Sequence, residues 1–249
     1  MKYAIKSAIK AGLSAFGIEI YRNRGGEIGT IAGFLGELRA RGFTPRGIID
    51  VGANRGDWTR LALSIFPDAS LIMIEPQDEM QPYLSKLCSS VAGCHYVKAG
   101  AAREAGELVQ TIWPDLSGSS FVPEVDSSQL RSGKQRKTPV VTIDSLLCET
   151  YPEFVPDLIK LDIQGFELEA LSGANTTFGR TEVFIVETSL FGFLERQPIT
   201  REVISFMFDR GYELYDITGY QRRPFDGALG QADLAFVKGE GRFRSEAKW

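Results

Sequence analysis

From residue 47 onward, short apolar runs alternate with stretches whose apolar residues recur at helical spacing. Fully apolar runs predict strands that are buried on both faces, and the helical stretches between them predict crossover connections. The sequence therefore predicts a mostly parallel sheet with helices on both faces. Strands are expected at 47–51, 71–74, 95–99, 158–161, 183–186, 212–217 and 233–237, and helices at 58–66, up to 87, at 167–171 and at 202–209.

Two regions depart from this alternation. The last two expected strands are joined by about 15 residues with no helical pattern, which predicts that they are antiparallel neighbours. The stretch from Pro114 to Pro139 is rich in serine, glycine, proline and charge. Such a long polar connection predicts a loop over the sheet, either a functional lid or an insertion.

The first 21 residues carry three lysines and a stripe of apolar residues at helical spacing. This pattern predicts an amphipathic helix with two alternative roles. It packs on the main domain or on a second subunit of a homodimer, or it lies on a membrane surface as a peripheral contact. We accordingly expect a helical extension at 1–45 and one domain at 46–249.

Composition excludes several functional classes. The chain has 249 residues with a formal net charge of −4, and its acidic balance argues against a nucleic-acid partner. Three cysteines without a C-x-x-C pair give neither a disulfide framework nor a zinc site, so a reducing, cytoplasmic location is expected. Because His95 is the only histidine, carboxylates are the expected groups for any proton transfer.

A glycine-containing turn follows the first expected strand, in the run Asp50-Val51-Gly52-Ala53-Asn54-Arg55-Gly56. Glycines allow a tight turn and let a ligand approach the backbone at the start of a helix. Glu75 ends the next strand, 19 residues after Gly56, where a carboxylate can accept the hydroxyl groups of an adenosine ribose. Together these features predict a nucleoside site, although Asn54 stands where a dinucleotide fingerprint has glycine.

Acidic residues also follow the fourth and fifth expected strands. Asp162 ends the run Ile159-Lys160-Leu161, Glu167 lies in the first turn of the next helix, and Glu187 ends the following strand. Ligands of open α/β sheets bind outside the carboxyl ends of the strands. We therefore expect these carboxylates to face the same crevice as the glycine turn. Three carboxylates of unknown geometry do not establish a metal site, and none is predicted.

These segments resemble the FkbM family of S-adenosylmethionine-dependent methyltransferases over roughly residues 46–240. The glycine turn resembles the family's first motif, and residues 160–167, KLDIQGFE, resemble its second signature, K-I-D-V-E-G-x-E. Residues 140–146, VVTIDSL, resemble the strand and helix start that precede this signature. Gln164 departs from the family pattern, which more often has glutamate there.

The resemblance implies a Rossmann-like class I methyltransferase fold, with a seven-stranded α/β sheet whose last strand is antiparallel. It also implies S-adenosyl-L-methionine as the cofactor and methyl donor. Asp162 is the first candidate for the base or hydroxyl orienter, followed by Glu167 and Glu187. The residues expected to bind the donor are Asp50, Gly52, Ala53, Asn54, Gly56, Glu75, Pro76, Gly100 and Ala101.

The function expected from these features is O-methyl transfer to a small-molecule or glycan acceptor. The acceptor would be a sugar hydroxyl of a glycan or lipid-linked oligosaccharide, or a natural-product hydroxyl. Two alternatives remain at this point. An NAD-dependent oxidoreductase would also use the turn and Glu75, and a non-catalytic nucleoside-binding module would tolerate Gln164.

Overall fold

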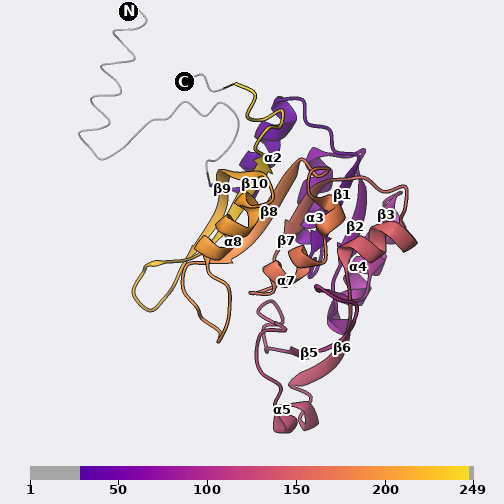
Figure 1. The fold of residues 1–249 in the computed structure, drawn as a ribbon. Helices are drawn as coiled ribbons and strands as arrows, with labels where there is room; N and C mark the ends of the chain where they lie inside the picture. Colours follow the sequence, from indigo (N-terminus) through magenta and orange to yellow (C-terminus); the bar gives the residue numbers. More distant parts are fainter. Residues whose placement is uncertain (1–28, 247–249) are drawn as a thin grey trace, which may run out of the picture.

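A seven-stranded sheet forms the centre of the molecule in the computed structural model, which describes residues 29–246 (Figure 1). The strand order is β3-β2-β1-β7-β8-β10-β9. The strands are β1 (Gly47–Val51), β2 (Ser70–Ile74), β3 (Cys94–Val97), β7 (Pro156–Leu161), β8 (Val183–Ser189), β9 (Tyr212–Arg222) and β10 (Leu229–Lys238). The α-helices are α2 (Ile31–Ala40), α3 (Asp57–Ile65), α4 (Gln81–Ser90), α5 (Ser127–Arg131), α6 (Ile143–Ser145), α7 (Glu167–Ser172) and α8 (Thr200–Phe208), with shorter turns η1 (Asp78–Met80), η2 (Leu146–Thr150) and η3 (Asn175–Thr177).

Strand directions confirm the predicted fold class. β3, β2, β1, β7 and β8 pair in parallel, whereas β10 is antiparallel to both β8 and β9. Every residue of β1 and β7 is buried, as expected for parallel strands that are covered on both faces. The carboxyl ends of β1, β2 and β7 therefore meet at one edge of the sheet.

Helices cover both faces of this sheet, and side chains alternate between them along each strand. Ile48 packs into the layer formed with α2, α3 and α4, whereas its neighbour Ile49 packs into the layer formed with α6, α7 and α8. Each of the two apolar clusters contains residues of β1, β2, β7, β8 and β10. This double burial fixes the register, because a shift by one residue would exchange the two faces.

A second, three-stranded sheet shortens the loop expected at 114–139, because its strand β6 includes the last residues of that stretch. Its order is β4-β6-β5, with β4 at Gly100–Ala101, β5 at Gly106–Thr111 and β6 at Gln135–Val141. α5 also lies within the expected loop. β5 is exposed over its first half and β6 alternates buried with exposed residues, so neither strand has the continuous apolar run that marked the central strands. The third expected strand likewise ends at residue 97 rather than 99.

The β9–β10 hairpin is antiparallel, as predicted, but its connection is shorter than expected. The strands extend to Arg222 and from Leu229, so that only residues 223–228 connect them. The outer parts of β9 are largely exposed, and their polar side chains concealed the strand in the sequence.

The amino-terminal helix expected at 1–21 lies outside the described residues, and so do its predicted membrane and dimer contacts. The described part of the predicted extension forms α2, whose Phe34, Leu35 and Leu38 are buried in the core. α2 packs against α3 and β9. Within residues 29–246 no helix has the length and apolarity that a bilayer crossing requires.

Gly173 provides a test of this packing. A Cβ at position 173 would lie 2.1 Å from the Ala102 carbonyl oxygen. This oxygen belongs to the main chain, so relieving the overlap would require a backbone shift. We expect Gly173→Ala to lower the free energy of unfolding by about 1–3 kcal/mol in urea titrations. Gly192→Ala is the matched control, because its nearest atom is 3.9 Å away and the change should stay within about 0.5 kcal/mol. Equal stability of the two variants would contradict the described contact.

Candidate active site

A cavity of about 270 Å³ opens at the carboxyl ends of β1, β2 and β7, and we call it the main cavity. Segments from both sheets enclose it, since Gln110 of β5 and the connection between β5 and α5 contribute to its wall. Seven of the predicted donor-binding residues line it, namely Gly52, Ala53, Asn54, Glu75, Pro76, Gly100 and Ala101.

The turn after β1 is held against the loop after β7. Gly52 has φ +81° and its N–H donates to the Ile74 carbonyl oxygen at 2.9 Å. A Cβ at this position would lie 2.0 Å from the Asp162 carbonyl oxygen. Glycine is therefore required for the two loops to touch, in addition to any approach of a ligand.

Glu75 joins the ends of β1 and β2. One carboxylate oxygen accepts the Asn54 N–H at 2.9 Å, and the other accepts the Gln77 backbone N–H at 3.0 Å and its side-chain amide at 3.2 Å. Burial raises the pKa of Glu75, and these hydrogen bonds oppose that rise. A carboxylate offers about four lone-pair positions, so Glu75 retains the capacity to accept a further donor.

Two buried polar atoms near the cavity have no partner among residues 29–246. They are the indole N–H of Trp58 and the side-chain oxygen of Gln77, and both residues line the main cavity. Buried polar atoms are almost always hydrogen-bonded, so unpaired ones call for an explanation. A bound molecule with an acceptor near Trp58 and a donor near Gln77 would satisfy both atoms.

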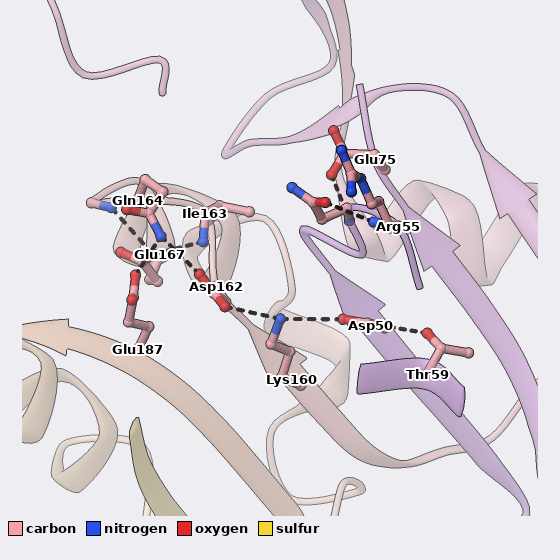
Figure 2. Close-up of polar contacts among 12 residues, drawn as sticks. Asp50, Arg55, Thr59, Glu75, Lys160, Asp162, Ile163, Gln164, Glu167 and Glu187 are labelled. Carbon is pink, nitrogen blue, oxygen red and sulfur yellow. Dashed lines mark hydrogen bonds and ion pairs between the residues drawn. The ribbon is translucent and has the colours of Figure 1, made fainter. Parts of the chain in front are cut away.

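A buried lysine lies between two carboxylates at the end of β7 (Figure 2). The Lys160 ammonium is 3.2 Å from Asp162 and 3.5 Å from Asp50, and Asp50 accepts a hydrogen bond of 2.6 Å from the Thr59 hydroxyl. Burial opposes the charge of Lys160, but the two carboxylates raise its pKa. Lys160 therefore remains charged, and it acts as the counterion of both aspartates.

Gln164 extends this row of polar side chains to β8. Its side-chain amide donates to Asp162 and to Glu187, each at 3.0 Å (Figure 2). Burial raises the pKa of Asp162, but the charge of Lys160 and these hydrogen bonds bring it below the ordinary value. Burial and the neighbouring carboxylates raise the pKa of Glu187 well above its ordinary value. The two carboxyl groups thus differ in proton affinity.

Glu167 supports the turn that follows β7. One of its carboxylate oxygens accepts the N–H groups of Ile163 at 2.9 Å and Gly165 at 3.2 Å. Gln164 and Gly165, inside this turn, have φ values of +56° and +93°. Left-handed backbone at a non-glycine residue is uncommon, and the Glu167 carboxylate stabilises it here. Glu167 does not line the main cavity.

The remaining predicted residues lie elsewhere. Asp50 is buried beneath the cavity and does not line it, and Gly56 faces Leu84 and Leu87 of α4. Gly100 lines the cavity, but a Cβ there would meet the Phe121 ring at 2.6 Å, so its small size makes room for protein. Glu187 lines a separate cleft beside β10.

Sequence reasoning assigned no role to several cavity residues. Lys160 had a detectable signal, because it lies two positions before Asp162 in a strand and so faces the same side. Phe121 lies in the stretch 114–139, which was predicted to form a loop over the sheet, although no role was assigned to the residue itself. Nothing in the sequence pointed to Gln110 of β5. Other cavity residues without a predicted role are Arg55, Asp57 and Trp58.

The sheet order and the cavity at the carboxyl ends of its strands define a Rossmann-like α/β fold. The model of the methyltransferase FkbM domain matches residues 50–214, so the chain belongs to the FkbM methyltransferase domain family. This assignment agrees with the resemblance found in the two sequence motifs.

Two curated proteins and a solved structure are similar to this chain. Methyltransferase sdnD of Sordaria araneosa is 26% identical over 195 residues, 67% of this chain and 73% of the relative. Methyltransferase 1 of Beauveria bassiana is 25% identical over 142 residues, 51% of this chain and 57% of the relative. The crystal structure of methyltransferase FkbM from Methylobacillus flagellatus superimposes with a TM-score of 0.49 at 17% identity, covering 77% of this chain and 44% of that protein.

Glu167 should act on stability through its turn. Glu167→Ala leaves the N–H groups of Ile163 and Gly165 unpaired and should lower the free energy of unfolding by about 1–3 kcal/mol. Glu167→Gln keeps an acceptor oxygen and should cost less. Urea titrations of the two variants compare these effects, and equal losses would contradict the supporting role.

The pH dependence gives a second measure of Glu167. Burial raises its pKa from 4.5 to about 7, although backbone hydrogen bonds oppose the rise. The folded state therefore binds this proton more tightly, and its stabilising effect is lost as the pH rises from about 4.5 to about 7. Wild-type stability should fall over this range relative to Glu167→Gln, whereas parallel curves would contradict the raised pKa.

Proposed function

We propose that this protein is an S-adenosylmethionine-dependent O-methyltransferase that acts on a hydroxyl group. The favoured acceptor is a sugar hydroxyl in a glycan or lipid-linked oligosaccharide, with a natural-product hydroxyl as the other form of the same chemistry. One observation carries the proposal: the main cavity joins the Glu75 nucleoside end to the acidic end of β7 within one space.

The chain has groups that suit the donor. Glu75 would accept ribose hydroxyl groups, Gln77 would contact the nucleoside beside it, and the Trp58 N–H would donate to an oxygen of the amino-acid part. S-adenosylmethionine supplies an activated methyl group when it is bound. The protein therefore has to align the acceptor with the donor, and such positioning supplies much of a rate enhancement.

Asp162 and Glu187 would have different roles in the transfer. Asp162, ionised by its contact with Lys160, would accept the hydrogen bond of the acceptor hydroxyl and orient its oxygen. Glu187 has a raised pKa, which makes its ionised form the stronger base for the released proton. Gln164 donates to both groups. An ionised glutamate at position 164 would add a negative charge and could not donate a hydrogen bond to either carboxyl group. Gln164 is therefore compatible with catalysis.

A cytoplasmic location accompanies the proposal. Cys88, Cys94 and Cys148 are free thiols in the structure, which suits a reducing compartment.

Donor identity can be tested by thermal shift. S-adenosylhomocysteine should raise Tm in a concentration-dependent manner, whereas NAD at the same concentrations should leave it unchanged, since only a bound ligand stabilises the folded state. Glu75→Gln should weaken the S-adenosylhomocysteine affinity by about tenfold or more in calorimetry, through loss of a charged acceptor. Glu107→Gln is the control, because Glu107 is an exposed carboxylate that does not line the main cavity. An increase in Tm with NAD but not with S-adenosylhomocysteine would contradict the proposed methyl transfer.

Asp162 can be tested by separating binding from turnover. Asp162→Asn should lower kcat by about 10²–10⁴-fold, the usual range for a lost proton-transfer or orienting group. The S-adenosylhomocysteine affinity should change by less than about fivefold, because Lys160 keeps Asp50 as a counterion. Donor consumption with a panel of hydroxyl acceptors measures the first quantity and calorimetry the second. Full turnover in this variant would remove Asp162 from the mechanism.

A further inference from the structure

A row of acidic positions continues across the sheet beyond the site described above. Asp162 directly follows β7, Glu187 lies beside it on β8, and Asp233 of β10 pairs with Glu187 in the antiparallel register. Gly219 of β9 pairs with Asp233. Because residues in register on neighbouring strands face the same side, the row leads from the main cavity toward the β9–β10 hairpin.

A cleft of about 180 Å³ lies at the far end of this row, and we call it the β10 cleft. Gln231 is two residues from Asp233, and Gln221 pairs with Gln231, so both amides share the face of the carboxylates. The volume admits several waters or a small polar molecule. Glu187, Tyr220, Gln221, Gln231, Ala232 and Asp233 line the cleft.

Asp233 has an unusual environment in this cleft. Among residues 29–246 its carboxylate makes no hydrogen bond and no ion pair, and the residue is half-buried. Burial and the charge of Asp162 raise its pKa. A Cβ at Gly219 would lie 2.2 Å from an Asp233 carboxylate oxygen, so the glycine creates the space that this carboxylate occupies. Asp233 lines the β10 cleft, and its carboxylate oxygens are left open to accept hydrogen bonds from a ligand there.

We propose that the β10 cleft is the acceptor subsite and binds a neutral polyhydroxylated ring such as a sugar. This inference rests on the methyltransferase function proposed above and extends it to a particular binding site. Carboxyl oxygens and amide groups together accept and donate the hydrogen bonds that a set of hydroxyl groups requires. Tyr220, which is 63% exposed, adds an aromatic surface beside them.

The chemistry of the cleft favours a neutral ligand over a cationic amine. Burial and the charge of Asp162 raise the pKa of Asp233, and a protonated carboxyl group both donates and accepts hydrogen bonds. A cationic amine would be bound most strongly by an ionised Asp233. The amides of Gln221 and Gln231 are neutral in either case.

The position of the cleft suits transfer from the main cavity. Gln164 lines the main cavity and donates to Glu187, which lines the β10 cleft. A ring held by Asp233 would therefore present a hydroxyl to Glu187 and Asp162 at the boundary between the two spaces. The O–H proton would pass to the ionised Glu187 carboxylate while the oxygen takes the methyl group from the sulfonium.

Binding of simple probes in the presence of saturating S-adenosylhomocysteine tests the proposal. The neutral probes are methyl glucopyranoside, methyl mannopyranoside, methyl galactopyranoside and myo-inositol, and spermidine is the cationic comparison. Saturation-transfer NMR titrations give each Kd. We expect at least one neutral probe to bind, and Asp233→Ala to weaken it by about tenfold or more.

Gly219→Ala provides an independent variant that preserves the carboxylate. Its new methyl group should displace the Asp233 side chain and weaken the same probe, while the fold is maintained because alanine suits a strand no less than glycine. Asp216→Asn is the matched control, since Asp216 is an exposed carboxylate on the same hairpin outside the cleft, and it should leave the Kd unchanged.

Each outcome decides the proposal. Weakened neutral-probe binding in Asp233→Ala and Gly219→Ala, with unchanged S-adenosylhomocysteine affinity, supports it. Absence of neutral-probe binding below about 10 mM, equal binding in all variants, or Asp233-dependent binding of spermidine alone overturns it. Failure of S-adenosylhomocysteine itself to bind would instead refute the proposed donor, which keeps the two failures distinguishable.

Discussion

The buried ammonium group of Lys160 is the constraint on which the site depends. A charge removed from water is tolerated only with close counterions, and loss of one partner typically costs about 3–5 kcal/mol. Asp50 on β1 and Asp162 after β7 are those partners. The contact of Lys160 with both carboxylates fixes the relative register of the two central strands. The same contact keeps Asp162 ionised at the edge of the main cavity.

From this ion pair the polar row divides the carboxyl edge of the sheet into two spaces. On one side, Glu75 and the turn after β1 border the main cavity. On the other side, Glu187 and Asp233 border the β10 cleft. Gln164 joins the two because a neutral amide can donate to a carboxylate on either side without adding to the negative charge. The family's usual glutamate would need a proton to make the same contacts.

The central sheet could be predicted from sequence because its strands are buried on both faces and read as uninterrupted apolar runs. The small sheet could not. β5 and β6 have one exposed face, and their polar residues resemble those of a loop. The positions of Gly52, Asn54 and Glu75 at the cavity wall could also be predicted, from the glycine turn and the strand that follows it. Phe121 and Gln110 required the tertiary structure, since only the fold brings the β4-β6-β5 sheet over the main cavity.

Motif residues divide into those that face a ligand and those that hold the chain in place. Glu167 belongs to the second signature, yet its carboxylate is used by two backbone N–H groups of the turn. Gly52 belongs to the first motif, yet its missing side chain admits the Asp162 carbonyl group. Both residues help to position Asp162 and Gln164 at the wall of the main cavity, which Gly52 also lines and Glu167 does not. The spacing of motifs in a sequence therefore predicts where the crevice lies. Whether a motif residue contacts a ligand or supports the backbone depends on the hydrogen bonds that its side chain makes within the protein.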